Sequence, residues 1–102
     1  MAIVKASMAP VGTGTPSLSK YVARAIKVLE AQTSVKYQLT PMDTVLEGDL
    51  DQVLAVIRQM HESLFDGEVQ RVVTTIAIDD RRDKPASMDA KVRSVKSKLN
   101  ES

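Results

Sequence analysis

The order in which the hydrophobic period changes along this chain constrains its fold more than any other feature. Residues 2–8 alternate between apolar and polar side chains, a pattern that predicts a half-buried strand. From Ser17 the apolar residues recur with the period of an amphipathic helix. The same two periods return as strands over 35–40 and 44–47, a helix from Asp49, and a strand over 71–79. The sequence therefore predicts the element order β-α-β-β-α-β.

This order is typical of an α+β chain with the ferredoxin-like fold. Two right-handed β-α-β units interleave into a four-stranded antiparallel sheet, with both helices on one face. A chain of 102 residues has room for one hydrophobic core, so we expect a single domain over residues 1–102. A weaker apolar stripe predicts an extra C-terminal helix, capped by Ser87 and carrying Met88, Val92, Val95 and Leu99.

The helix boundaries are marked by side chains that suit helix ends. After a loop that starts at Pro10, Thr15 and Pro16 suit an N-cap followed by proline at the first helical position. Asp49 followed by Gln52 is a variant of the capping box, and Gly67 is expected to end the second helix. The predicted apolar stripes are Leu18, Tyr21, Val22, Ala25, Ile26 and Leu29 in the first helix, and Leu50, Val53, Leu54, Ile57, Met60 or His61, Leu64 and Phe65 in the second.

One face of the predicted sheet carries no helix. Strand alternation places an apolar centre on this open face, beside polar neighbours: Ile3, Val73 and Ala77 with Lys5, Ser7 and Thr75. Exposed apolar patches of this kind usually bind a partner. We therefore expect the chain to associate with itself through this face, and we expect Val73→Asp to break the assembly.

The composition excludes several classes of function. Cysteine is absent and His61 is the only histidine, which excludes disulfides, thiolate nucleophiles and multi-histidine metal sites. A net charge of +1, with two Tyr, one Phe and no Trp, argues against nucleic-acid binding. No apolar run approaches the roughly 20 residues that span a bilayer, and residues 1–8 do not resemble a signal peptide. We expect a cytoplasmic protein with no membrane partner, no metal and no cofactor.

Three local motifs each have a structural and a functional interpretation. The glycine-containing loop before the first helix is either a flexible connection with a helix cap, or an anion site formed by amides near Thr15 and Ser17. His61-Glu62 lacks the second histidine of a zinc protease motif, because Phe65 stands there, which favours a partly buried helix histidine. The segment 79–84 holds three acids and three bases, which favours an ion-pair network over acid–base catalysis. We expect no phosphatase or peptidase activity.

A set of polar and aromatic residues lies near the predicted central hairpin. Tyr37, Thr44 and Glu47 belong to the hairpin, and Ser7 belongs to the first strand. A carboxylate, hydroxyls and a ring would suit a flat cationic or amine-bearing molecule. In the alternative interpretation, Tyr37 is a core residue and the other three are surface polar groups.

Residues 36–48 and 71–84 resemble a family of small cytoplasmic proteins described as thiamine-binding proteins. Residues 19–23 and 88–95 fit the same family, while Asp43 stands where glycine is usual. The resemblance implies a ferredoxin-like subunit in homotetramers, arranged as dimers of dimers. It also implies binding of thiamine or its hydroxymethylpyrimidine part, as a carrier, buffer or sensor, and no established enzyme activity.

Given this ligand, the sequence suggests a role for each candidate residue. Glu47 would hold the amine or the cation, Thr44 and Ser7 the ring nitrogens, and Tyr37 would lie against a ring. Any phosphate would bind the amides near Thr15 and Ser17. The alternative function is a regulatory or assembly module that binds another protein. A third and weaker hypothesis is an enzyme that acts on a phosphorylated small molecule, because a nucleophile and metal ligands are missing.

Overall fold

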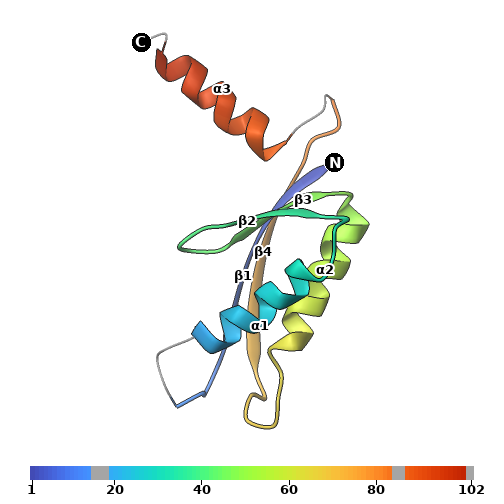
Figure 1. Cartoon of the computed structure of the whole chain (residues 1–102), viewed down its shortest axis with the longest axis vertical. Coiled ribbons are helices and arrows are strands. Elements are labelled where there is room, and N and C mark those ends of the chain that lie inside the picture. Colours follow the sequence, from blue (N-terminus) through green and yellow to red (C-terminus); the bar gives the residue numbers. More distant parts are fainter. Residues whose placement is uncertain (15–18, 84–86, 101–102) are drawn as a thin grey trace.

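A computed structural model describes residues 1–14, 19–83 and 87–100. Its elements follow the order β-α-β-β-α-β-α (Figure 1), which confirms the predicted fold class. They are β1 (Ala2–Pro10), α1 (Ser19–Glu30), β2 (Lys36–Leu39), β3 (Thr44–Gly48), α2 (Leu50–Ser63), β4 (Val72–Asp80) and α3 (Met88–Asn100).

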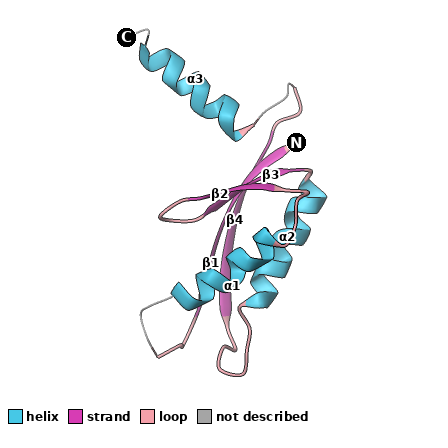
Figure 2. Ribbon diagram, in the orientation of Figure 1, coloured by secondary structure: helices cyan, strands magenta, loops and turns pink. Residues whose placement is uncertain are grey.

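The four strands form one antiparallel sheet in the order β2-β3-β1-β4. The central strand β1 pairs with β4 along its whole length, from Ala2 opposite Asp80 to Pro10 opposite Val72. Helices α1 and α2 pack side by side and cover one face of the sheet (Figure 2). This is the ferredoxin-like arrangement of two interleaved β-α-β units.

The hydrophobic core lies between these two helices and the central strands. Val4 of β1, Leu46 of β3, Leu29 of α1 and Val53 of α2 are completely buried. Val4 and Leu46 are cross-strand partners, so their side chains point to the same face of the sheet. Burying side chains of this size contributes roughly 1.5–3 kcal/mol each, and this layer therefore holds the helices against the sheet.

The buried arcs of the helices differ from the predicted stripes. Val22 was predicted to face the core but is 52% exposed, while Val56, absent from the predicted stripe, is buried. Phe65 is also largely exposed, at 39%. The α2 arc runs through Val53, Val56, Ile57, Met60 and Leu64. An apolar residue beside this arc satisfies the same periodicity, so the period alone does not define the arc's edges.

The helix ends confirm some caps and correct others. Asp49 caps α2, but its carboxylate accepts from the backbone N–H of Asp51 at 3.0 Å and not within a capping box with Gln52. The C-cap of α2 is Leu64, not Gly67, because α2 ends in a right-handed conformation that needs no glycine. Ser87 caps α3 as predicted, with its Oγ accepting from Ala90 N–H at 3.0 Å. The caps predicted at Thr15 and Pro16 lie outside the described residues.

The strand register confirms the predicted open face. Ile3, Lys5 and Ser7 lie opposite Asp79, Ala77 and Thr75, so these six residues share the face that lacks α1 and α2. Val73 is 47% exposed.

Strand β4 is also exposed on the face where the helices pack. Ile76 and Ile78 pair with Ala6 and Val4 on that face, yet they remain 40% and 49% exposed. The two helices therefore cover the centre of the sheet and leave this edge strand open on both sides.

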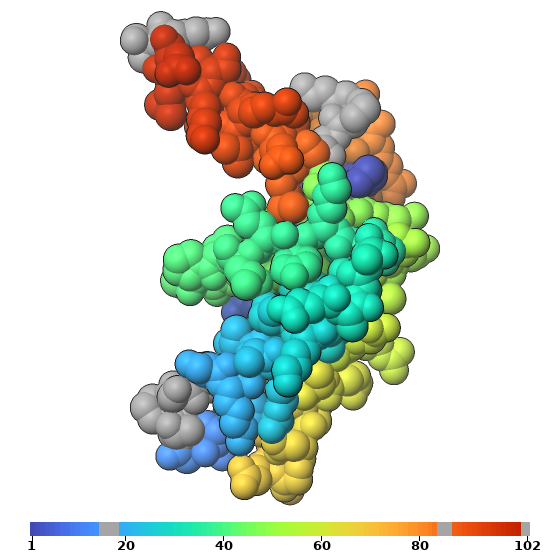
Figure 3. Space-filling model, in the orientation of Figure 1, coloured from blue at the N-terminus to red at the C-terminus, as the bar shows by residue number. Residues whose placement is uncertain are grey.

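Helix α3 stands apart from the rest of the subunit (Figures 1 and 3). None of its side chains is buried, and Val92, Val95 and Leu99 are 49%, 60% and 67% exposed. Lys91 forms an ion pair with Asp79 of β4, which ties the first turns of α3 to the sheet. No helix among the described residues is long and apolar enough to cross a membrane.

Candidate functional site

A cavity of about 240 Å³ lies between α1, β1 and the β2–β3 hairpin. It forms where β1 and β3 diverge. Their pairing ends at Ala6 opposite Thr44, whereas β1 continues alongside β4 to Pro10. The hairpin connection and the last turns of α2 close the space. The lining residues are Ala6, Ser7, Met8, Tyr21, Val22, Ala25, Ile26, Leu39, Thr40, Pro41, Met42, Asp43, Thr44, Met60 and Leu64.

Most of the cavity wall is apolar and polarisable. Three methionines, Met8, Met42 and Met60, contribute to it, and methionine sulfur makes favourable contacts with aromatic rings. Tyr21 supplies an aromatic ring that is only 4% exposed. Lys20 Nζ and the Arg24 guanidinium each lie 5.2 Å from the centre of that ring, which helps to fix its position. Such a wall suits a flat aromatic ligand.

The polar side of the cavity is the Thr40–Asp43 turn. The Thr40 hydroxyl lies 3.0 Å from the Asp43 carbonyl oxygen and 2.8 Å from its Oδ1, to both of which it donates. The same hydroxyl accepts from the backbone N–H of Asp43 at 3.0 Å. A backbone bond from Thr40 N–H to the Asp43 carbonyl, 2.9 Å long, closes the turn. The turn therefore holds one carboxylate at the cavity in a fixed orientation.

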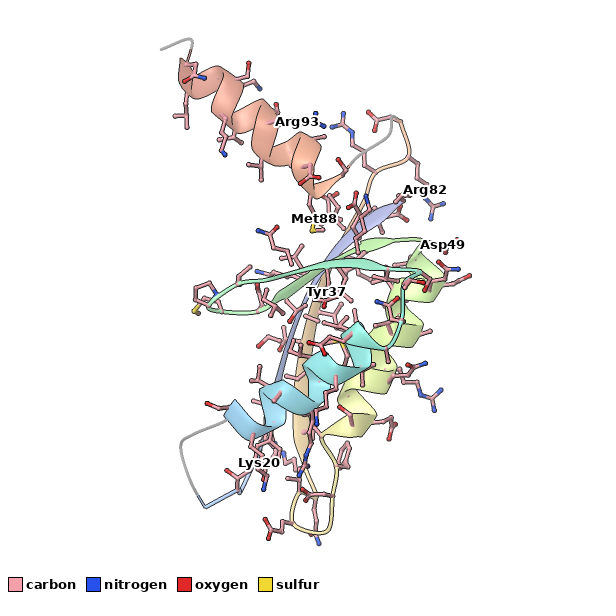
Figure 4. The ribbon with its side chains drawn as sticks, viewed as in Figure 1. Lys20, Tyr37, Asp49, Arg82, Met88 and Arg93 are labelled. Atoms are coloured by element: carbon pink, nitrogen blue, oxygen red, sulfur yellow. The ribbon has the colours of Figure 1, made fainter. Side chains whose placement is uncertain are left out.

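The predicted site residues fall into separate places. Ser7 and Thr44 both border the cavity, but only the Thr44 side chain lies on the helix-covered face, since Ser7 shares the open face with Lys5. Tyr37 and Glu47 line a different, shallower depression of about 470 Å³, formed with Met88 and other residues. Met88 stands at the start of α3, above strand β2, which carries Tyr37 (Figure 4). Thr15 and Ser17 lie outside the described residues.

The separation follows from strand geometry. Thr44 and Glu47 are three residues apart on β3, so they point to opposite faces of the sheet. Thr44 pairs with Ala6 on the helix-covered face, and Glu47 pairs with Ile3 on the open face. Glu47 is 6% exposed and makes no hydrogen bond or ion pair among the described residues. The four residues therefore do not reach a single ligand within one subunit.

The remaining motifs have structural partners. Asp79 pairs with Lys91, Asp80 with Arg82 at 2.8 Å, and Arg81 with Asp83 at 2.6 Å, which confirms the predicted ion-pair network. The hydrogen bond from Arg82 holds the pKa of the Asp80 carboxyl below its usual value. His61 is a partly buried helix histidine as predicted, with Nδ1 2.7 Å from Thr74 Oγ1. Lys84 lies outside the described residues.

The sequence did not identify two of the cavity's main residues. The sequence indicates Tyr21 only as a member of an apolar helix stripe, and Asp43 only as a residue that stands where the family usually has glycine. The available signal was the Thr40-Pro41-Met42-Asp43 segment, where a polar turn joins two strands directly opposite an amphipathic helix. Among the described residues, no group of three or more His, Asp or Glu side chains is placed to hold a metal ion.

Comparison with known proteins gives consistent matches over nearly the whole chain. The sequence model of a family described as thiamine-binding protein matches residues 4–96. The chain is 48% identical to the UPF0045 protein YqgV of Bacillus subtilis, over 97% of this chain and 98% of that protein.

Solved structures agree with these sequence matches. The hypothetical protein MJ1052 of Methanocaldococcus jannaschii superposes with a TM-score of 0.83 at 36% identity, over 92% of this chain and 94% of that one. A Thermotoga maritima protein with a suggested role in thiamine biosynthesis or salvage superposes with a TM-score of 0.74 over 92% and 97% of the two chains. At 20% identity, that second likeness shows the fold alone.

Proposed function

Because the chain belongs to the thiamine-binding protein family, we propose that it binds thiamine or its hydroxymethylpyrimidine part in the cavity between α1 and the β2–β3 hairpin. The observation that carries this proposal is the cavity itself, which combines a mostly apolar wall with a few convergent polar groups. At about 240 Å³ it is smaller than the pockets that hold drug-sized ligands, which run to roughly 300–1,000 Å³. A ligand of one or two small rings suits it.

The cavity residues offer a contact for each part of such a ligand. Tyr21 and the methionines would lie against the aromatic rings. Thr44 would hydrogen-bond a ring nitrogen, as the sequence suggests, whereas the hydroxyl of Ser7 points to the open face and takes no part in the cavity. A phosphate tail would extend toward the start of α1, near Thr15 and Ser17, where the helix dipole is positive.

Two of the candidate residues need a different role in this account. Glu47 lies on the open face, and Tyr37, which pairs with Leu46, does not line the cavity, so Tyr21 takes the ring contact there. We keep Glu47 as a candidate for a cationic group, because its carboxylate borders the depression, is mostly shielded from water and pairs with no cation among the described residues. That cation would come from a neighbouring subunit or a second ligand.

We also propose that the subunits assemble into homotetramers, as dimers of dimers. Three exposed apolar surfaces support assembly: the open face of the sheet, the Ile76 and Ile78 side of β4, and the stripe on α3. Burying them against other copies would remove large apolar side chains from water, at roughly 25 cal/mol for each Å². The tetramer would act in the cytoplasm as a carrier, buffer or sensor and not as an enzyme.

The alternative function is a module that binds a different protein. The exposed α3 favours it, since an amphipathic helix without an intramolecular partner can lie in a groove of another chain. Sedimentation equilibrium of the purified chain separates the two accounts. A mass of about four times 11.1 kDa supports self-assembly, and a monomer at micromolar concentration favours the alternative.

Filling the cavity tests the ligand-binding proposal. Ala25 lines the cavity and is 6% exposed, so Ala25→Met would place a longer side chain where the ligand binds. We expect calorimetric titration with thiamine to show a loss of affinity of at least about tenfold, or about 1.4 kcal/mol. Ala23→Met is the matched control, because Ala23 lies on the exposed side of the same helix. Equal affinity in the two variants would contradict binding in this cavity.

A further inference from the structure

Asp43 is the only acidic or basic residue among the described residues that line the cavity. We infer that its carboxylate makes the cavity select a cationic heteroaromatic ring over a neutral one. This inference rests on the proposed function and extends it, because it names the charge class of the preferred ligand and the residue that sets it.

The first support is the way Asp43 is held. Its Oδ1 accepts from the Thr40 hydroxyl at 2.8 Å, and that hydroxyl accepts from the Asp43 backbone N–H at 3.0 Å. The carboxylate orientation is therefore set before a ligand arrives, which reduces the entropy lost on binding. Its second oxygen, Oδ2, has no hydrogen bond among the described residues and is available to a ligand.

The second support is the absence of a compensating cation. No Lys or Arg among the described residues forms an ion pair with Asp43. Of the two α1 cations over the Tyr21 ring, Arg24 pairs with Asp66 at 2.7 Å and Lys20 forms no ion pair with Asp43. A hydrogen bond from the neutral Thr40 hydroxyl orients the carboxylate and leaves its charge in place.

The third support is the surrounding wall. Asp43 is only partly exposed, and the cavity beside it is lined by apolar side chains such as Met8, Met60 and Leu64. In such surroundings the attraction between opposite charges is stronger than in bulk water. A delocalised ring cation would satisfy both the apolar wall and the carboxylate, while a neutral ring would satisfy the wall alone.

The test compares thiamine, whose thiazolium ring is cationic, with hydroxymethylpyrimidine, which is uncharged at the pH of 8 used for the titration. Asp43→Asn removes the charge and keeps an oxygen that accepts from Thr40. We expect calorimetry at pH 8 to show about a tenfold loss of thiamine affinity, the scale of a charge-assisted hydrogen bond. Hydroxymethylpyrimidine affinity should change by less than about twofold.

A matched control removes a charge far from the cavity. Asp51 is exposed in the first turn of α2, while the opposite end of α2 lines the cavity at Met60 and Leu64, roughly 14 Å and 20 Å away along the helix axis. Asp51→Asn should leave the affinity of both ligands unchanged. Circular dichroism and sedimentation of both variants should match the wild type.

Each other outcome has a definite meaning. If Asp43→Asn weakens both ligands equally, or leaves thiamine affinity unchanged, the inference is overturned and the proposed function stands. If the wild type binds hydroxymethylpyrimidine but not thiamine, the selection for a cation is likewise overturned. If the wild type binds neither ligand, the proposed function fails and the inference fails with it.

Discussion

The two faces of the sheet differ in how completely the helices of one subunit cover them. The face under α1 and α2 holds a closed core, with Val4, Leu46 and Leu29 fully buried, and a cavity at one end. The open face carries a depression around Glu47, and α3 stands beside it without a single buried side chain. The comparison indicates that one chain closes the covered face around a core and a cavity, whereas the open face leaves apolar side chains such as Val73 exposed.

The largest expected effect comes from the covered face. Leu46→Ala would leave a cavity in the core and lower the free energy of unfolding by about 2–5 kcal/mol. Leu39→Ala is the matched change at a side chain that is 53% exposed, and it should cost less than about 1 kcal/mol. Urea denaturation of both variants measures the difference. Similar losses would show that the two leucines do not differ in burial as described.

The next effect concerns the open face. Val73→Asp would place a carboxylate in the proposed interface, where it loses water without gaining a partner. The dissociation constant of the assembly should therefore rise at least about 100-fold. Sedimentation across a concentration series measures this. Val11→Asp, just beyond the end of β1, is the control and should leave the assembly unchanged. A wild type that is already monomeric would contradict the assembly proposal.

A third substitution separates the two faces as ligand sites. The sequence-based role for Glu47 predicts that Glu47→Gln weakens thiamine binding by about 1.5–3 kcal/mol. Binding in the cavity predicts a change of less than about twofold, because Glu47 lies in the depression on the other face. Thiamine titration of this variant decides between them. A large loss would move the site to the open face or to a contact between subunits.

The smallest expected effect is a dependence of stability on acid pH. Arg24, followed by the backbone N–H groups of Val69 and Glu68, lowers the pKa of Asp66 from 3.8 to about 2. Because the folded-state pKa is lowered, this stabilisation is complete above pH 3.8 and is lost as the pH falls toward 2. Thermal denaturation between pH 4 and pH 2 should therefore show a smaller decline in Asp66→Asn than in the wild type. An identical decline would contradict the assignment.

The sequence predicted the fold well because the fold depends on local periodicity. The alternation in β4 and the helical period in α2 are each readable over one segment, and the connections allow few topologies. The edges of the buried arcs were harder to predict, as Val22 and Val56 show, because they depend on what each helix packs against. Gly67 was misassigned because Leu64 ends α2 without a left-handed residue.

The candidate site was only partly predictable from the sequence. The alternation of side chains along a strand already separates Thr44 from Glu47, so the sequence alone could have assigned them to opposite faces. The cavity was not, because it depends on where β1 leaves β3 and on how α1 crosses that gap. Tyr21 and Asp43 come together only through those long-range contacts.

The most direct test of the central claim is to locate the ligand with methionine methyl resonances. The chain has five methionines, of which Met8, Met42 and Met60 line the cavity, while Met88 lines the depression on the open side. Thiamine added to methyl-labelled protein should shift the resonances of the three cavity methionines and leave those of Met1 and Met88 in place. A saturable shift of Met88 with the cavity methionines unchanged would contradict binding beneath α1.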